Sequence, residues 1–164
     1  MKEKGKHSSV YLIGPLAIKL FRKGMSKNAS KEWNILKRLK KTGLAPIPYL
    51  KLGRLVVMSR IKGKRVGDMS GGEIKTHTKK FLLALNTLDK MNIMKDENHR
   101  PKKHFMVYYG RVKLIDFERS KEGHGNVTQF LSYLRHFYPG IEKFGKNYKK
   151  TLDLKPILKF IGPK

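Results

Sequence analysis

The feature that most constrains this chain is a short apolar strand ending in a single carboxylate, within the stretch Gly110–Glu118. The residue pattern predicts a strand over Arg111–Ile115, which places Asp116 at its end. A second apolar run, Phe105–Tyr108, precedes it, and Tyr109–Gly110 form a tight turn, so a hairpin is predicted. An acid at the end of a hairpin strand lies at the rim of the core, where it can hold a metal ion. The alternative is that this Asp only begins a turn.

The net charge is the second constraint. The chain has 164 residues, with 38 Lys and Arg against 12 Asp and Glu, which gives a formal charge of +26. Polyanions are the natural partners of such a chain: RNA, ribosomal particles, DNA or nucleotides. The alternative is a lysine-rich surface that only keeps the protein in solution. The basic residues are spread along the whole chain, so they indicate a broad positive field and no sequence-reading element.

Several classes of site are excluded by composition. The chain has no Cys, which rules out disulfides and thiolate metal sites. It has six His, but no pair has the i, i+4 spacing of a helical zinc site. It contains no long apolar run and no signal-peptide pattern, so we expect a soluble, cytoplasmic protein with no membrane contact.

The first half of the chain predicts strands and one helix. Residues 9–13 and 16–21 alternate or run apolar and are predicted as two strands around Gly14-Pro15. A helix is predicted over residues 30–42, capped by Asn28 or Ser30 and ended by Gly43. Its apolar face would contain Trp33, Leu36, Leu39 and the stem of Lys40. Residues 49–52 and 54–60 predict a second hairpin that turns at Gly53.

The second half is mostly helical. Residues 63–72 contain four Gly and form a connector. A helix follows over residues 73–91, and residues 92–104 form a polar loop before the 105–115 hairpin. Helix returns over 127–137, breaks at Pro139-Gly140 and resumes in short segments to Ile161. The buried stripe of the long helix would be Ile74, His77, Phe81, Leu82, Leu85 and Leu88. Strands first and helices later indicate an α+β fold with two lobes.

Lys19 and Glu32 are candidates for a functional pair. Lys19 has apolar neighbours and is either the solvent-facing half of an alternating strand or an ammonium that binds phosphate. A phosphate-binding Lys needs a carboxylate to hold it, and Glu32 is the only acid between Glu3 and Asp68. The alternative for Glu32 is that an acid in a helix's first turn suits the helix dipole.

Two further features have a functional and a structural interpretation. The turn Gly5–Val10 can cover phosphates with backbone N–H groups, with Val10 over a flat base, or it is only a hairpin turn. Aromatic side chains near the C-terminal half can stack on bases, although aromatics at helical spacing are more often core. These aromatic residues are Tyr108, Tyr109, Tyr133, Phe137 and Tyr138.

The order of these features resembles the protein-kinase-like fold over roughly residues 5–138. It looks most like the atypical kinases of the RIO and lipopolysaccharide-kinase-like groups, and especially the short archaeal predicted Ser/Thr kinases. The resemblance rests on Gly5, Ala17-Ile18-Lys19, Glu32, Val56–Arg60, the loop Glu97…Arg100-Pro101…Lys103-His104, Ile115–Arg119 and Asn126–Phe130. It implies a reduced two-lobed domain over residues 1–164, with an N-lobe at 1–62, a connector at 63–72 and a C-lobe at 73–164.

The resemblance also implies ATP and Mg²⁺ as cofactors. Lys19 would contact the nucleotide phosphates, Glu32 would hold it, and Asp116 would bind Mg²⁺. The backbone of Met58–Arg60 would be the hinge that meets adenine. The remaining nucleotide contacts would come from Gly5, Ser8, Val10 and Ala17, and the hinge residues are Met58, Ser59 and Arg60.

The catalytic loop departs from the family's pattern. Glu97, with Asp96 beside it, stands where kinases have a catalytic Asp, and Lys102 stands where they have a metal-binding Asn. A Lys cannot bind Mg²⁺ but can neutralise phosphate charge. Glu118 also replaces the usual Gly after Asp-Phe. Two functions remain open: an ATP-dependent kinase of the Ser/Thr protein kinase type with an unidentified acceptor, and a weakly catalytic kinase-like module that binds RNA or ribosomes.

Overall fold

The computed structural model describes residues 2–162, and the chain forms two compact units. Unit 1 comprises residues 1–63 and 113–120, and unit 2 comprises residues 64–112 and 121–164. None of the helices in the described range is long and apolar enough to cross a membrane.

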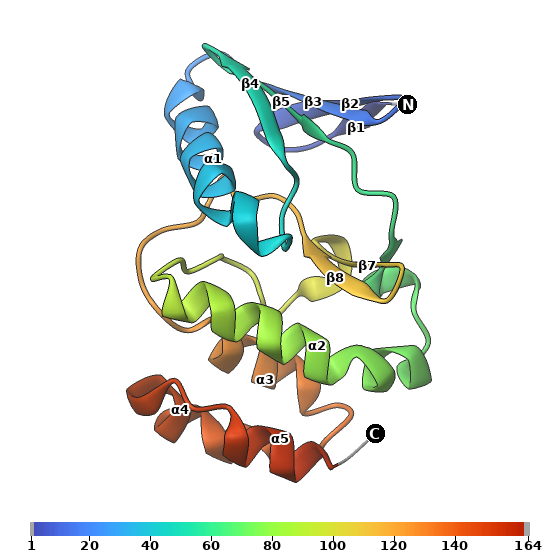
Figure 1. Ribbon diagram of the computed structural model, residues 1–164, viewed down its shortest axis with the longest axis vertical. Helices are drawn as coiled ribbons and strands as arrows, with labels where there is room; N and C mark the ends of the chain where they lie inside the picture. The colour runs from blue at the N-terminus through green and yellow to red at the C-terminus, as the bar shows by residue number, and fades with distance from the viewer. Residues whose placement is uncertain (1, 163–164) are drawn as a thin grey trace. The chain divides into compact units, whose positions relative to one another are not determined.

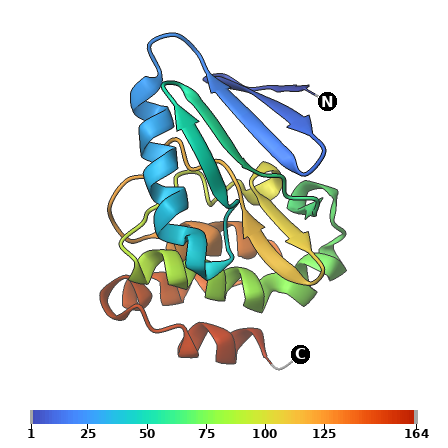
Figure 2. The ribbon, with the colours of Figure 1, turned by 45° about the horizontal axis from the view of Figure 1, so that its top comes forward.

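Unit 1 contains a five-stranded antiparallel sheet in the order β1-β2-β3-β5-β4 (Figures 1 and 2). The strands are β1 Lys2–Lys4, β2 Ser8–Ile13, β3 Leu16–Phe21, β4 Pro48–Leu52 and β5 Leu55–Ser59. Both predicted hairpins are confirmed. The strand that sequence patterning missed is β1, because its three residues, Lys-Glu-Lys, have no apolar pattern; it forms by pairing with the edge of β2.

The two faces of this sheet follow from the alternation along β3. Ala17, Lys19 and Phe21 are buried, whereas the residues between them are only half-buried. Lys19 therefore lies on the inner, covered face of the sheet and is 5% exposed. The interpretation of this Lys as the solvent-facing half of an alternation is wrong, because helix α1 covers the face to which it points.

Helix α1 spans Ser26–Leu39 and continues as a 3-10 turn over Lys40–Thr42. It begins four residues before the prediction, after Met25, with no side-chain cap, so Asn28 and Ser30 lie inside it. Its end at Gly43 is confirmed, with φ of 68°. The expected contribution of the Lys40 stem to the apolar face is wrong, because Lys40 is exposed and the buried positions are Ala29, Glu32, Ile35, Leu36 and Leu39.

The late prediction of the helix start also misplaced Glu32. In the structure this residue is in the second turn of α1, so its carboxylate is not explained by the helix dipole, which acts within the first turn. Glu32 is instead one of the buried residues of the helix.

Unit 2 is mostly helical. Its elements are β6 Lys64–Arg65, η2 Val66–Asp68, α2 Gly71–Lys90, η3 Pro101–Lys103, β7 Phe105–Tyr108, the first two residues of β8 Arg111–Leu114, α3 Asn126–Leu134, η4 Ile141–Phe144, α4 Gly145–Thr151 and α5 Lys155–Ile161. Strands β6, β7 and β8 form a second sheet, and β8 leads the chain into unit 1. The predicted buried stripe of α2 is confirmed except at His77, which is half-buried.

The hairpin turn between β7 and β8 is confirmed, but two of its aromatic residues are not in the core. Tyr109 and Gly110 both have positive φ, 46° and 69°, as a two-residue hairpin turn requires. Tyr108 is 36% exposed and Tyr109 is 87% exposed, so the expectation that they are core residues is wrong. Tyr133, Phe137 and Tyr138 are half-buried.

A buried polar network fixes the loop over residues 92–104 to helix α3. The Asn126 side chain accepts hydrogen bonds from the backbone N–H of Lys95 at 2.8 Å and from Asn98 Nδ2 at 2.7 Å. Its own Nδ2 donates to Asp89 Oδ1 and to the Ile93 carbonyl, each at 2.7 Å. The polar loop predicted from the sequence is therefore held by side-chain hydrogen bonds, and its regular structure is limited to the short 3-10 helix η3.

Candidate active site

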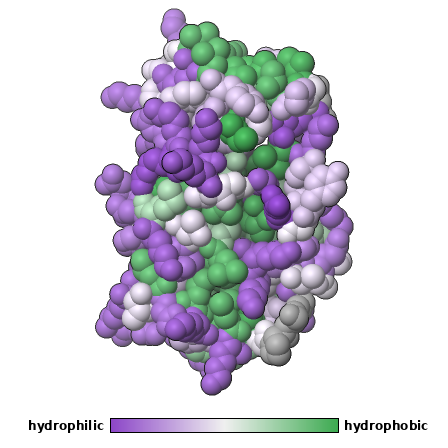
Figure 3. Space-filling view, in the orientation of Figure 1, coloured by the Kyte–Doolittle hydropathy of each residue, from purple (hydrophilic) through white to green (hydrophobic). Residues whose placement is uncertain are grey.

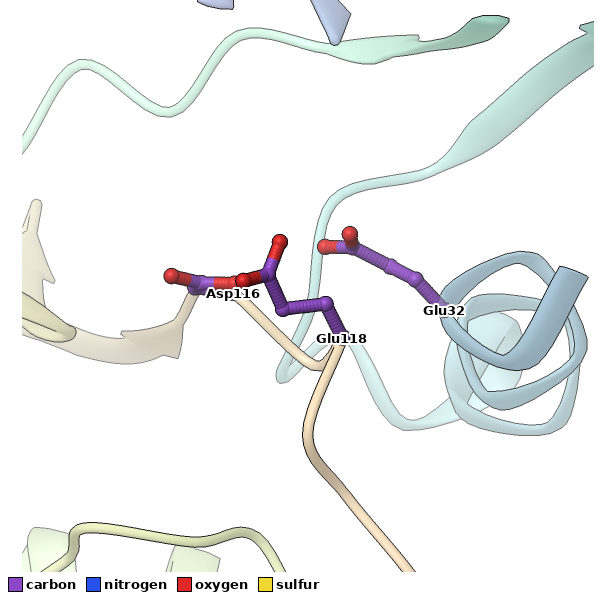
Figure 4. A group of neighbouring side chains, drawn as sticks. All are labelled: Glu32, Asp116 and Glu118. Atoms are coloured by element: carbon purple, nitrogen blue, oxygen red, sulfur yellow. The ribbon is translucent and has the colours of Figure 1, made fainter. Parts of the chain in front are cut away.

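Three carboxylates surround one buried ammonium in unit 1. Lys19 Nζ lies 2.7 Å from Glu32 Oε2, 2.9 Å from Asp116 Oδ1 and 3.0 Å from Glu118 Oε2. The Lys comes from β3, the first Glu from α1, and the other two acids from the segment after β8. Figure 4 shows the three carboxylates pointing toward one another. Residues nearly a hundred positions apart in the chain thus form one cluster.

The backbone after β8 is bent so that both acids reach the ammonium. Asp116 has φ of 66°, in the left-handed region that residues other than Gly seldom adopt. Phe117 is fully buried, and its N–H donates to Glu32 Oε1 at 3.2 Å. Such strain costs about 1–3 kcal/mol and is typical of functional sites.

The charges in the cluster shift one another's protonation. Burial acts to lower the pKa of Lys19, but the carboxylates, Glu32 first, outweigh burial and hold its pKa above the ordinary value. Burial raises the pKa of Glu32, and the ammonium opposes this rise. The charged form of Lys19 is thus favoured, and its ammonium lies between the three carboxylates.

Glu118 is the site residue that sequence reasoning missed. It was identified only as a replacement for Gly, yet its side chain is 8% exposed and contacts the ammonium as closely as Asp116 does. The signal in the sequence was weak: a second acid two residues after Asp116, in a chain with few acids.

The residues present fit a divalent cation. One oxygen from each of the three carboxylates lies within 4.8 Å of the others. Glu32 Oε2 and Glu118 Oε2 are buried, and each lies within 3.0 Å of Lys19 Nζ. If all are ionised, three carboxylates against one ammonium leave an excess of two negative charges. A hard cation such as Mg²⁺ takes carboxylate oxygens as ligands.

Comparison with solved structures identifies the fold. The chain is similar to Rio2 kinase from Chaetomium thermophilum in its complex with ADP, Mg²⁺ and phosphoaspartate, with a TM-score of 0.68 and 17% identity over 98% of this chain and 68% of that one. A second structure of Rio2 kinase from the same organism has a TM-score of 0.65 and 15% identity over 98% of this chain and 69% of that one. The fold is that of an atypical protein kinase. No protein-family model matches the chain, and no curated protein does.

The predicted α+β class and the reduced kinase-like fold are therefore confirmed. The structure also places the other predicted nucleotide contacts in unit 1. Gly5 N–H donates to the Ser8 carbonyl at 2.8 Å, which closes a tight turn between β1 and β2. Val10 pairs with Lys19 across β2 and β3, and Ala17 pairs with Met58 across β3 and β5.

The expected hinge residues lie at the end of β5 and just after it. Ser59 N–H donates to the Ile47 carbonyl and Arg60 N–H donates to the Pro15 carbonyl, each at 2.8 Å. These two donors already have acceptors within unit 1.

The candidate catalytic-loop residues belong to unit 2. Asp96 Oδ1 accepts a hydrogen bond from Glu97 N–H at 3.1 Å, and Glu97 Oε2 lies 3.7 Å from His104 Nε2. Glu97 has φ of 67°, in the left-handed region. The predicted catalytic acid Glu97 and the predicted metal ligand Asp116 therefore both have strained backbones. Lys102 is exposed on η3.

Proposed function

We propose that this chain is an Mg-ATP-dependent phosphotransferase of the Ser/Thr protein kinase type. The observation that carries the proposal is the cluster of Lys19 with Glu32, Asp116 and Glu118, within 3.0 Å of one ammonium. In kinases a Lys on a strand, held by a helix Glu, pairs with the nucleotide phosphates, and an Asp binds the metal. The whole chain would act as one kinase-like domain, with residues 63–72 as the connector between its lobes.

The side chains have separate roles in this proposal. Lys19 binds the phosphates of ATP, and Glu32 holds its ammonium in place. Asp116 and Glu118 hold Mg²⁺, which neutralises phosphate charge when bound. Two carboxylates so close together would replace the metal-binding Asn that Lys102 does not supply.

Chemistry at the acceptor would depend on the loop in unit 2. Glu97 accepts the proton of the acceptor hydroxyl, and Asp96 holds the backbone of Glu97 through its hydrogen bond. Lys102 would neutralise phosphate charge. The nucleotide itself would lie against the Gly5–Val10 turn, Ala17 and the backbone of Met58–Arg60.

Labelled ATP with the purified protein tests this function. Turnover should be lost in Lys19→Ala and fall by about a hundredfold or more in Glu97→Gln, as expected for loss of a general base. Lys31→Ala is the matched control, because Lys31 is an exposed Lys next to Glu32 on α1. Equal turnover in the wild type and Lys19→Ala would exclude the proposal.

The chemical nature of the labelled product distinguishes two acceptors. One of the similar structures contains a phosphoaspartate, and Asp116, with a side chain 35% exposed, is the most accessible carboxylate of the cluster here. Label on an Asp is an acyl phosphate and is removed by hydroxylamine, whereas label on Ser or Thr survives. Hydroxylamine-resistant label on a second protein would support the Ser/Thr kinase type.

The second candidate function is a kinase-like module that binds RNA or ribosomal particles. The observation that favours it is the charge of +26. Affinity for an RNA oligonucleotide would then fall steeply as salt rises, with roughly one counterion released per phosphate contact. RNA binding that is absent or insensitive to salt would exclude this function. Both functions can hold together, because a basic kinase can act on a ribonucleoprotein particle.

A further inference from the structure

The side of the unit 1 sheet that faces away from Lys19 is apolar across three strands. Directly opposite residues in an antiparallel pair lie on the same face, and Val57 pairs with both Ile18 and Leu50. In the next such row, Leu55 pairs with both Leu20 and Leu52. These six aliphatic residues, in two adjacent rows across β3, β5 and β4, are called the outer face below.

The strand sequences are those of a sheet covered on both sides. A sheet with one face in water shows alternating apolar and polar residues, whereas a sheet covered on both faces shows continuous apolar runs. Strand β3 reads Leu-Ala-Ile-Lys-Leu-Phe, and strand β5 reads Leu-Val-Val-Met-Ser. The only charged residue in these two strands is Lys19, which lies on the inner face. The sequence of the strands therefore indicates a second covering layer.

Within the described part of unit 1, only the inner side has such a layer. Helix α1 reaches Lys19 through Glu32, and the 113–120 segment reaches it through Asp116, so both lie on the inner side. On the outer side, Leu50 is 46% exposed, Leu52 is 61% exposed, and Ile13 at the end of β2 is 59% exposed. Figure 3 shows apolar side chains gathered over the part of unit 1 where β4 and β5 turn in Figure 1.

Within unit 1, the charged residues beside the outer face are basic. Unit 1 has eighteen Lys and Arg residues but only four Asp and Glu residues. Three of the acids surround Lys19. The fourth, Glu3, is opposite Val10 in the sheet, and Val10 is opposite Lys19. Glu3 therefore also lies on the inner face. Lys2 lies over the Tyr11 ring at 5.0 Å on one side of the outer face, and Arg54 lies in the β4–β5 turn on another.

We propose that the outer face is a docking surface for an acidic protein partner, which covers it with an apolar side and pairs its carboxylates with the basic rim. A second copy of this chain is disfavoured, because it would bring two strongly positive units together. RNA has no aliphatic groups to cover six Leu, Ile and Val side chains. An anionic membrane is disfavoured because these residues belong to the face of a sheet, whereas interfacial insertion typically uses an amphipathic helix.

The test uses a synthetic probe, a fluorescent helical peptide of about 18 residues, or five turns, with Leu along one side and Glu at the positions that flank this side. We expect it to bind the full chain and to shift the NMR signals of the Ile18, Leu20, Leu55 and Val57 methyl groups. Leu52→Lys should weaken binding at least tenfold. Leu83→Lys is the matched control, because Leu83 is a 47% exposed Leu on α2 of unit 2, and it should leave binding unchanged.

Four results would overturn the proposal. The first is equal binding of a peptide with Gln in place of Glu, and the second is wild-type binding by Leu52→Lys. The third is a chain that sediments as a dimer, which Leu52→Lys dissociates. The fourth is a shift of the same methyl signals by an RNA oligonucleotide or by anionic vesicles. ATP binding, measured in parallel, should be unchanged in Leu52→Lys, because Lys19 points to the opposite side of the sheet. The outcome is thus independent of the proposed kinase activity.

Discussion

Glu118 is the residue whose removal would separate the proposed Mg²⁺ binding from the rest of the site. Because its carboxylate is buried beside Asp116, Glu118→Gln should raise the Mg²⁺ concentration needed for half-maximal ATP binding by about tenfold or more. Titration calorimetry of ATP at several Mg²⁺ concentrations measures this. Glu122→Gln, an exposed acid four residues later, is the control. Unchanged Mg²⁺ dependence in Glu118→Gln would show that Glu118 only pairs with Lys19.

Asp89 is a buried hydrogen-bond acceptor that joins several segments of unit 2. Its buried carboxylate accepts hydrogen bonds from the backbone N–H groups of Gly125, Asn126 and Val127, from the Asn126 side chain and from the Tyr148 hydroxyl. Asp89→Ala should therefore lower the free energy of unfolding by about 3 kcal/mol or more, because several buried donors lose their acceptor.

The variant Tyr148→Phe gives the loss of unfolding free energy expected when Asp89 loses a single hydrogen bond. It removes one hydroxyl, at 2.8 Å from Asp89 Oδ2, and should cost only about 1 kcal/mol. Urea denaturation of the wild type and both variants measures the difference. A loss in Asp89→Ala no larger than that in Tyr148→Phe would contradict the central role of this carboxylate.

At the level of elements, the start of helix α2 contains a pH-dependent cap. Ser70 Oγ accepts a hydrogen bond from Glu73 N–H, and the Glu73 side chain accepts one from Ser70 N–H at 2.8 Å. Hydrogen bonds from Lys64, and then from the Ser70 backbone, lower the pKa of Glu73 from 4.5 to about 2. This capping box is a local sequence signature that the helix prediction left unused.

Because the folded pKa is lowered, the contribution of Glu73 to stability is present above pH 4.5 and is lost as the pH falls toward 2. Glu73→Gln should therefore melt at a lower temperature than the wild type at pH 6, and the two should converge near pH 2. Thermal unfolding monitored by circular dichroism measures this. A gap that stays constant from pH 6 to pH 2 would show that the charge of Glu73 has no role.

At the scale of the whole molecule, the charge of +26 should destabilise the folded chain through self-repulsion. Raising ionic strength from about 0.01 to 0.1 M shortens the screening length from about 30 to about 10 Å. We expect Tm to rise by about 3 °C or more, equivalent to roughly 1 kcal/mol for a chain of this size. Calorimetry in NaCl and in KCl should give the same rise. A Tm that falls with salt would mean that attractive ion pairs outweigh the repulsion.

The sequence by itself determined those strands, helices and residues of the Lys19 cluster that short-range residue patterns reveal. Hairpin strands and turn residues have short-range patterns, so β2, β3, β4, β5 and the β7–β8 hairpin were predicted within a residue or two. The rarity of acids singled out Glu32, and the end of a strand singled out Asp116.

Only the tertiary structure decided which sides of these elements are covered. The face to which Lys19 points depends on where α1 packs, and the role of Glu118 depends on a strained backbone at Asp116. The acceptor role of Asp89 depends on residues about 36 to 59 positions away. Burial and ion pairing depend on which distant segments meet, and local residue patterns do not contain that information.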